Sequence, residues 1–253
     1  MGILRHRLEQ LSRGVVFSRR LPKAFGKRKI VVSPEAGLKY WKWGSAYADQ
    51  MLLSTAKNEV GKGDVVWDIG ANVGLFSLAA MAVAGPQGKC LSMEPDNFLV
   101  TLIQRTARTN TDLQIDVLPC AVSNVVGVTY LNIAERARAS NFLSDAEGTS
   151  QAGGARYQQI CPTVDLNFLL AHYEAPHFVK IDVEGAEHLI FEGAERLLTE
   201  ARPKILTEIS AENAPGIYQL LQAHDYQIFH AITKEPNPVS ASNILAIPSE
   251  RTS

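Results

Sequence analysis

The sequence has few cysteines and no long apolar run, and both absences limit what the protein can be. Its three cysteines, Cys90, Cys120 and Cys161, are scattered through a chain of 253 residues. An odd number of distant cysteines argues against a disulfide framework, and no Cys-x-x-Cys or His-x-x-x-His spacing is present to hold zinc. No apolar stretch approaches the roughly 20 residues that a membrane-spanning helix needs. We therefore expect buried thiols in a reducing compartment and a cytoplasmic protein.

Positive charge is concentrated at the start of the chain. The first 30 residues hold nine lysines and arginines and one acid, Glu9, whereas the remaining residues hold 16 bases and 25 acids. Leu4, Leu8, Leu11 and Val15 are spaced for one face of a helix. We expect a basic N-terminal helix that packs on the domain; the alternative is an arm, residues 1–30, that makes peripheral contact with a membrane or binds a polyanion.

From residue 61 the chain alternates short apolar runs with longer helical patterns, which favours βαβ units in an α/β fold with a mostly parallel sheet. Strands are expected at 65–67, 89–93, 115–122, 178–183 and 205–209, with 226–229 and 244–247 as a closing pair. Helices are expected at 74–84, 97–108, up to 173, at 186–198 and at 214–223. Asp96 is placed to cap the second helix.

Two regions fall outside this alternation. Residues 1–60 are predicted to form a helical and extended N-terminal cover on a domain that spans residues 61–248. After an extra strand at 127–133, residues 134–160 are small, polar and glycine-containing. So long a stretch without regular structure is uncommon in a compact domain, so we expect an insertion or lid loop there.

A glycine turn links the first strand of the domain to its helix, where open α/β sheets bind nucleotide-like ligands. The segment reads Asp68-Ile-Gly70-Ala-Asn72-Val-Gly74. Asn72 breaks the Gly-x-Gly-x-x-Gly dinucleotide pattern, and no Gly-x-x-x-x-Gly-Lys-Ser/Thr phosphate loop is present. An acid beside the turn repels a pyrophosphate but suits a ligand with an amine and a sulfonium, such as S-adenosylmethionine. Glu94 ends the next strand, where a carboxylate accepts hydrogen bonds from ribose hydroxyls.

Three segments resemble the FkbM family of S-adenosylmethionine-dependent methyltransferases. They are the glycine turn, Thr163-Val-Asp-Leu166, and Val179-Lys-Ile-Asp-Val-Glu-Gly-Ala-Glu187 followed by Gly193. The resemblance covers residues 64–247. It implies a class I methyltransferase Rossmann-like fold, a seven-stranded sheet with helices on both faces. Members of the family mostly O-methylate hydroxyls of sugars or natural products, which leaves S-adenosylhomocysteine as the second product.

The resemblance also implies residue roles. Asp68, Gly70, Asn72 and Gly74 would surround the methionine part of the cofactor, and Glu94 would hold its ribose.

At the adenine, the resemblance places the end of the third strand, Ala121-Val122-Ser123, with Ser123 or Asn124 as the polar contact. Asp182 and Glu184 would lie beside the transferring methyl group, so that Asp182 also contacts the cofactor. The resemblance does not extend to residues 1–60 or 134–160, where we expect acceptor choice to lie.

The residues themselves also single out the strand at 178–183. Lys180, Asp182 and Glu184 would project to one side of it, and such charges are unusual in a buried parallel strand. Lys180 either pairs with an acid or serves the site. A neutral hydroxyl is a poor nucleophile, so we expect Asp182 or Glu184 to bind the acceptor hydroxyl, directly or, less favoured, through a divalent cation. Glu208 is a further candidate base, whereas His188 is more typical of a surface or packing residue.

Two more groups have weaker assignments. Ser140-Asn141, in the expected loop, either contacts substrate or is simply solvated. Tyr40, Trp41 and Trp43 form an aromatic cluster that either packs the N-terminal cover or stacks on an acceptor.

The sequence thus predicts an S-adenosylmethionine-dependent O-methyltransferase that acts on a sugar or small-molecule acceptor by in-line displacement. The alternatives are a methyltransferase of RNA or other nucleic acid, and a non-catalytic cofactor-fold binding module. The acidic charge beyond residue 30 argues against a nucleic-acid partner. No residue is assigned to a metal, and no pattern indicates an oligomeric state.

Overall fold

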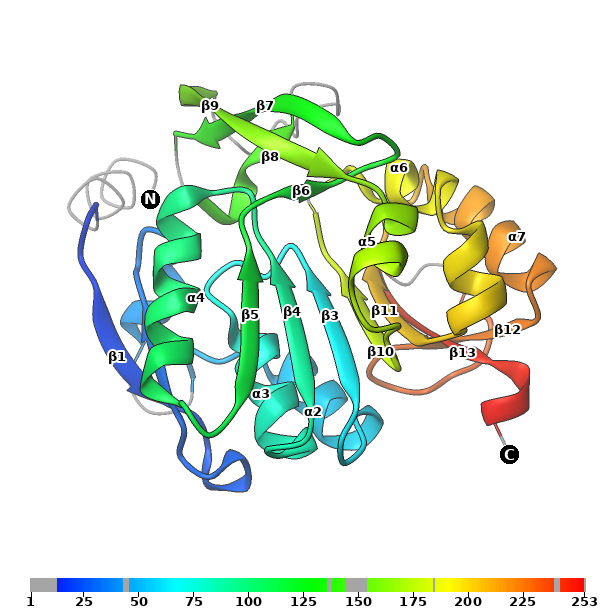
Figure 1. Ribbon diagram of the computed structural model, residues 1–253, viewed down its shortest axis with the longest axis horizontal. Coiled ribbons are helices and arrows are strands. Elements are labelled where there is room, and N and C mark those ends of the chain that lie inside the picture. The colour runs from blue at the N-terminus through cyan, green and yellow to red at the C-terminus, as the bar shows by residue number, and fades with distance from the viewer. Residues whose placement is uncertain are drawn as a thin grey trace.

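A seven-stranded sheet forms the centre of the molecule. The computed structural model describes residues 13–42, 46–135, 138–143, 154–183, 185–238 and 242–252, and Figure 1 shows the arrangement of their elements. The strands, in the order in which they lie side by side, are β12 (Tyr226–His230), β13 (Asn243–Pro248), β11 (Lys204–Glu208), β10 (Phe178–Ile181), β3 (Val65–Ile69), β4 (Lys89–Met93) and β5 (Gln114–Leu118).

The sheet is mixed. The five strands from β11 to β5 pair in parallel, whereas β13 is antiparallel to both β11 and β12. The expectation of a mostly parallel sheet is therefore met only in part. The parallel strands all end at one edge, and that edge holds the candidate site described below.

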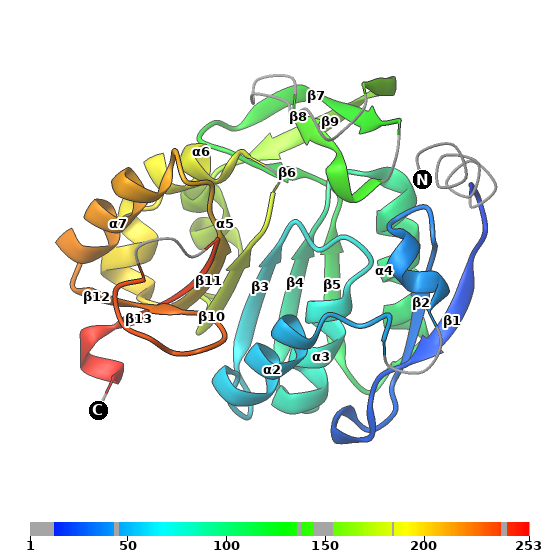
Figure 2. The same cartoon turned by 180° about the vertical axis from the view of Figure 1, so that it is seen from behind.

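Helices cover both faces of the sheet, as Figures 1 and 2 show. Buried side chains of α2, α3 and α4 pack on one face, and those of α5, α6 and α7 pack on the other. Within β3, Val66 faces the first group and Trp67 faces the second, as the alternation of a strand requires. The bounds are α2 (Gln50–Glu59), α3 (Leu75–Ala84), α4 (Asn97–Thr109), α5 (Leu166–His172), α6 (Glu187–Glu192) and α7 (Ala214–Ala223).

The described part of the N-terminal cover is both extended and helical, because it holds a β-hairpin and α2. A hairpin of β1 (Phe17–Arg20) and β2 (Lys29–Val32) lies along α4, because Thr106 Oγ1 accepts a hydrogen bond from the backbone N–H of Val31. The predicted helix through Val15 is wrong at its end, since residues 15 and 16 precede a strand and are not helical. Residues 1–12 of the basic leader lie outside the described residues.

A second, four-stranded sheet was not predicted. It has the order β6 (Ala121–Val122), β9 (Ala155–Val164), β7 (Gly127–Ala134) and β8 (Phe142–Leu143). Figures 1 and 2 show it lying across the end of the main sheet. The expected strand at 115–122 therefore divides between two sheets, and residues 155–160 of the expected loop form a strand. Residues 136–137 and 144–153 of that loop lie outside the described residues.

Other boundaries also differ from the prediction. The strand expected at 178–183 ends at Ile181, and the helix expected at 186–198 is interrupted after Glu192, before a π-helical turn at Leu197–Ala201. The three cysteines are free and buried, which confirms the expectation of buried thiols. None of the described helices is both long enough and apolar enough to cross a bilayer.

Candidate active site

A cavity of about 290 Å³ lies at the edge where the parallel strands end. The sheet order brings the end of β11, the segment after β10, the glycine turn after β3 and the segment after β4 side by side. Neighbouring strands are about 4.8 Å apart, so a ligand a few strands long spans all four segments. The predicted site residues that line the cavity are Gly70, Asn72, Glu94, Ala121, Asp182 and Glu208.

The glycine turn requires left-handed backbone at three positions. Gly70, Asn72 and Gly74 have φ angles of 72°, 54° and 78°, and Asn tolerates this region better than most residues with a side chain. At Gly70 a Cβ would overlap the carbonyl oxygen of Asp182, so the turn touches the segment after β10. Gly74 directly precedes α3 and is not among the residues that line the cavity.

Asp68 is fully buried beneath the turn rather than exposed in the cavity. One carboxylate oxygen accepts hydrogen bonds from the backbone N–H and the hydroxyl of Ser77 in α3. The other oxygen lies 3.1 Å from Lys180 Nζ. Asp68 and Lys180 are register partners on adjacent strands, so the pairing of β3 with β10 creates this ion pair.

Lys180 joins the buried acid to the cavity. Its Nζ also lies 3.4 Å from Asp182 Oδ2 and donates a hydrogen bond of 2.6 Å to the carbonyl oxygen of Gly70. Burial by itself lowers the pKa of Lys180, but the carboxylates of Asp68 and Asp182 outweigh it and hold that pKa above its ordinary value. Lys180 therefore fixes Asp182 and the turn relative to each other.

Glu94 directly follows β4, and both of its carboxylate oxygens accept hydrogen bonds. Oε2 accepts a hydrogen bond of 2.8 Å from the backbone N–H of Asn72, and Oε1 accepts one of 2.9 Å from that of Asp96. Burial, reinforced by Asp96, raises the pKa of Glu94 to about 8. Each oxygen has a further lone pair, and Asn72 Oδ1 is buried without a partner among the described residues. These acceptors fit the donor-rich ribose and amine of S-adenosylmethionine.

Comparison with protein families decides among nucleotide-like ligands. The sequence profile described as methyltransferase FkbM domain matches residues 68–228, which is more than half of the chain. The chain belongs to the FkbM methyltransferase family. This confirms the resemblance found in the sequence motifs, and the protein is an S-adenosylmethionine-dependent methyltransferase. No curated protein matches its sequence significantly.

Several solved structures are similar to this FkbM methyltransferase. The FkbM methyltransferase from Methylobacillus flagellatus KT is 16% identical, with 84% of this chain and 58% of that chain covered and a TM-score of 0.49. Fibrillarin from Aeropyrum pernix, in complex with natively bound S-adenosyl-L-methionine, is 11% identical over 91% and 92% of the two chains, with a TM-score of 0.47. A SAM-dependent methyltransferase from Aquifex aeolicus is 9% identical over 85% and 98%, with a TM-score of 0.47. The chain spans less than two thirds of the Methylobacillus structure.

The wall of the FkbM site beyond the turn is acidic. Asp182, whose side chain is 38% exposed, lies there with Glu208 and Asp49. Partial burial and the carboxylates of Asp182 and Glu187 raise the pKa of Glu208 above its ordinary value. Glu184 lies outside the described residues. No group of three or more His, Cys, Asp or Glu residues is arranged for a metal ion in the described part of the chain.

The N-terminal cover supplies polar cavity residues, among them Tyr40, which the sequence analysis assigned, and Asp49, which it did not. Asp49 caps α2, since its side chain accepts hydrogen bonds from the first turn of that helix, and it also lines the cavity. Tyr40 is 2% exposed, packs against Tyr47 and lines the cavity as well. Trp41 is exposed and contacts Phe17 instead. Trp43 lies outside the described residues.

The expected adenine end combines β6 with the inserted region. Ala121 lines the cavity, but Ser123 does not, and its hydroxyl lies 3.3 Å from the side-chain oxygen of Asn124. Arg138 and Asn141, from the expected lid, line the cavity beside them. Arg138 carried no signal in the sequence, because its ionic partners are distant in the chain. His188 is not among the lining residues.

Proposed function

We propose that the protein is an O-methyltransferase that transfers the cofactor's methyl group to a hydroxyl of a sugar or other small-molecule acceptor. The observation that carries this proposal is the pair of carboxylates on the far side of the glycine turn from Glu94. Asp182 follows β10 and Glu208 ends β11, so they lie one and two strands beyond the turn, with both carboxylates at the cavity. A ligand anchored at Glu94 and crossing the turn directs its far end toward them.

The two carboxylates are suited to different tasks. S-adenosylmethionine, when bound, supplies an electrophilic methyl group on a sulfonium. Asp182, held 3.4 Å from Lys180, accepts a hydrogen bond from the acceptor hydroxyl and orients it. Glu208, whose pKa is raised, takes the hydroxyl proton, because a base with a pKa nearer neutrality is better matched to proton transfer. Glu184 is proposed as a further acceptor contact.

The charge of the cavity supports a small acceptor rather than a nucleic acid. Asp49, Asp182 and Glu208 would repel the phosphates of RNA or DNA. Lys39, 4.0 Å from Asp49, and Lys180, 3.4 Å from Asp182, offset part of that charge. A neutral or amine-bearing polyol is therefore the acceptor class that the wall favours.

The test is turnover on a panel of sugars and natural-product alcohols, with mass spectrometry to detect a methyl ether. Asp182→Asn and Glu208→Gln are each expected to lower kcat about 100-fold, and Glu208→Gln is expected to leave the affinity for S-adenosylmethionine unchanged by calorimetry. Glu212→Gln is the control, since Glu212 is exposed and does not line the cavity. Equal activity of the Glu208 and Glu212 variants would refute the role of Glu208. Cofactor binding without turnover on any acceptor would favour the binding module.

A further inference from the structure

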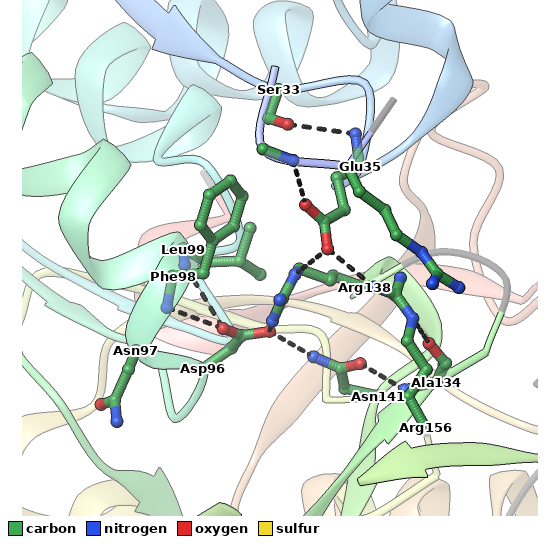
Figure 3. A network of polar contacts seen from close by, with 12 residues as sticks. Ser33, Glu35, Asp96, Asn97, Phe98, Leu99, Ala134, Arg138, Asn141 and Arg156 are labelled. Atoms are coloured by element: carbon green, nitrogen blue, oxygen red, sulfur yellow. Dashed lines mark hydrogen bonds and ion pairs between the residues drawn. The ribbon is translucent and has the colours of Figure 1, made fainter. Parts of the chain in front are cut away.

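The segment after Glu94 is held by side chains of the inserted region. Arg138 Nη1 and Asn141 Nδ2 donate hydrogen bonds of 2.6 and 2.7 Å to the same oxygen, Asp96 Oδ2. The backbone N–H of Asp96 in turn donates to Glu94 Oε1. Figure 3 shows Arg138 and Asn141 converging on Asp96 at the start of α4. Two side chains from the insertion are thus connected, through Asp96, to the carboxylate assigned to the ribose.

A third inserted side chain, Gln159 of β9, clamps the same segment through its backbone. Its Nε2 donates a hydrogen bond of 2.6 Å to the carbonyl oxygen of Pro95, and its Oε1 accepts one of 3.2 Å from the N–H of Asn97. Residues 95–97 are therefore held by hydrogen bonds to their backbone and to the side chain of Asp96. Such a clamp fixes the direction of the Glu94 carboxylate at the end of β4.

The N-terminal cover holds Arg138 from the other side. Glu35 Oε1 accepts hydrogen bonds from Arg138 Nε at 2.9 Å and from Arg156 Nη1 at 2.8 Å, as Figure 3 shows. Two guanidinium groups and the carboxylates of Glu35 and Asp96 make a neutral cluster, and all four side chains are at most 10% exposed. Arg138 donates from Nε to Glu35 and from Nη1 to Asp96, so one planar guanidinium joins two carboxylates.

We propose that Arg138, Asn141 and Gln159 are positioning residues for the cofactor, which act by fixing the Glu94 carboxylate toward the ribose. Glu35 extends this device into the N-terminal cover, ahead of the family match that begins at residue 68. The proposal rests on the assignment of Glu94 to the ribose. It assigns the described part of the insertion to cofactor retention, in addition to the acceptor choice expected of residues 134–160.

Arg156 provides a matched control. It binds the same Glu35 oxygen and is about as buried as Arg138, but it neither contacts Asp96 nor lines the cavity. Arg138→Met is expected to raise the Kd of S-adenosylmethionine about tenfold. A factor of this size corresponds to the loss of one hydrogen bond to a charged group. Arg156→Met is expected to leave that Kd within about twofold, and R138K to recover part of the loss. Calorimetry is done well below the melting temperature of each variant.

A cycle with Glu94→Gln separates positioning from general destabilisation. If Arg138 acts through Glu94, R138M weakens binding far less in the E94Q background than in the wild type. Equal losses in R138M and R156M, or a full R138M effect in E94Q, would overturn the proposal. Should R138M not fold, Asn141→Ala is taken through the same cycle, and an unchanged Kd in N141A overturns it. Wild-type affinity in E94Q alone would instead refute the ribose assignment of the proposed function.

Discussion

Replacing Lys180 with methionine tests whether the ion pair beneath the glycine turn holds the site together. Lys180 is 3% exposed and Asp68 is fully buried. Water therefore cannot take the place of the lost ammonium beside the Asp68 carboxylate. In the variant, Asp68 keeps the two donors of Ser77 on one oxygen and loses the cation 3.1 Å from the other. Removing one partner of a buried ion pair costs about 3–5 kcal/mol, because the remaining charge stays buried.

In a chain of this size each kcal/mol lowers the melting temperature by about 2–4 °C, so Lys180→Met should lower it by roughly 10 °C. Thermal and urea unfolding followed by circular dichroism measure the change. Asp68→Asn in the same background removes the uncompensated charge and should restore about 2 kcal/mol or more. A loss below about 1 kcal/mol in the single variant, or no recovery in the double variant, would refute the reasoning.

Three further predictions follow from single positions. The pKa of Glu94 is raised to about 8, and ribose hydroxyls favour its charged form, so the affinity for the cofactor should rise with pH up to about 8, with release of a proton on binding. Calorimetry in buffers of different ionisation enthalpy measures the affinity and the proton release. A pH-independent Kd would contradict the ribose contact. Gly70→Ala should abolish cofactor binding, because its Cβ overlaps the carbonyl oxygen of Asp182, whereas Gly216→Ala, in open space on α7, should bind normally and gain about 0.5–1 kcal/mol of stability. Asp165→Ala should cost about 1 kcal/mol in urea unfolding, because it removes the side-chain cap of α5, and unchanged stability would show that the cap is dispensable.

The parts of the fold that local signals determine were predictable. The strand at residues 89–93 and the helix at residues 214–223 agree with β4 and α7 at both ends. The strand expected at 115–122 failed at Pro119, which has no N–H for the ladder, so β5 ends at Leu118. The second sheet escaped prediction because β7 and β9 pair across a polar, glycine-containing stretch of chain that we expected to be an insertion or lid loop.

The site was likewise predictable where local sequence signals determine it. Gly70, Asn72 and Glu94 follow from the turn and the next strand end, and all three line the cavity. The burial of Asp68 could not be predicted from the sequence. Its ion pair with Lys180 depends on the register between β3 and β10, two strands that are far apart in the sequence.

The residues that line the cavity support the N-terminal cover, one of the two regions expected to choose the acceptor, as the place of acceptor selection. Arg138 lies with the segment after β4, on the cofactor side, through contacts with Asp96. The acidic wall is instead shared with the N-terminal cover, since Tyr40 and Asp49 line the cavity that Asp182 enters. Burial raises the pKa of Tyr40, and the carboxylates of Asp49 and Asp182 raise it further. Substitutions at Tyr40 or Asp49 are therefore expected to change the KM of the acceptor and leave the Kd of S-adenosylmethionine unchanged.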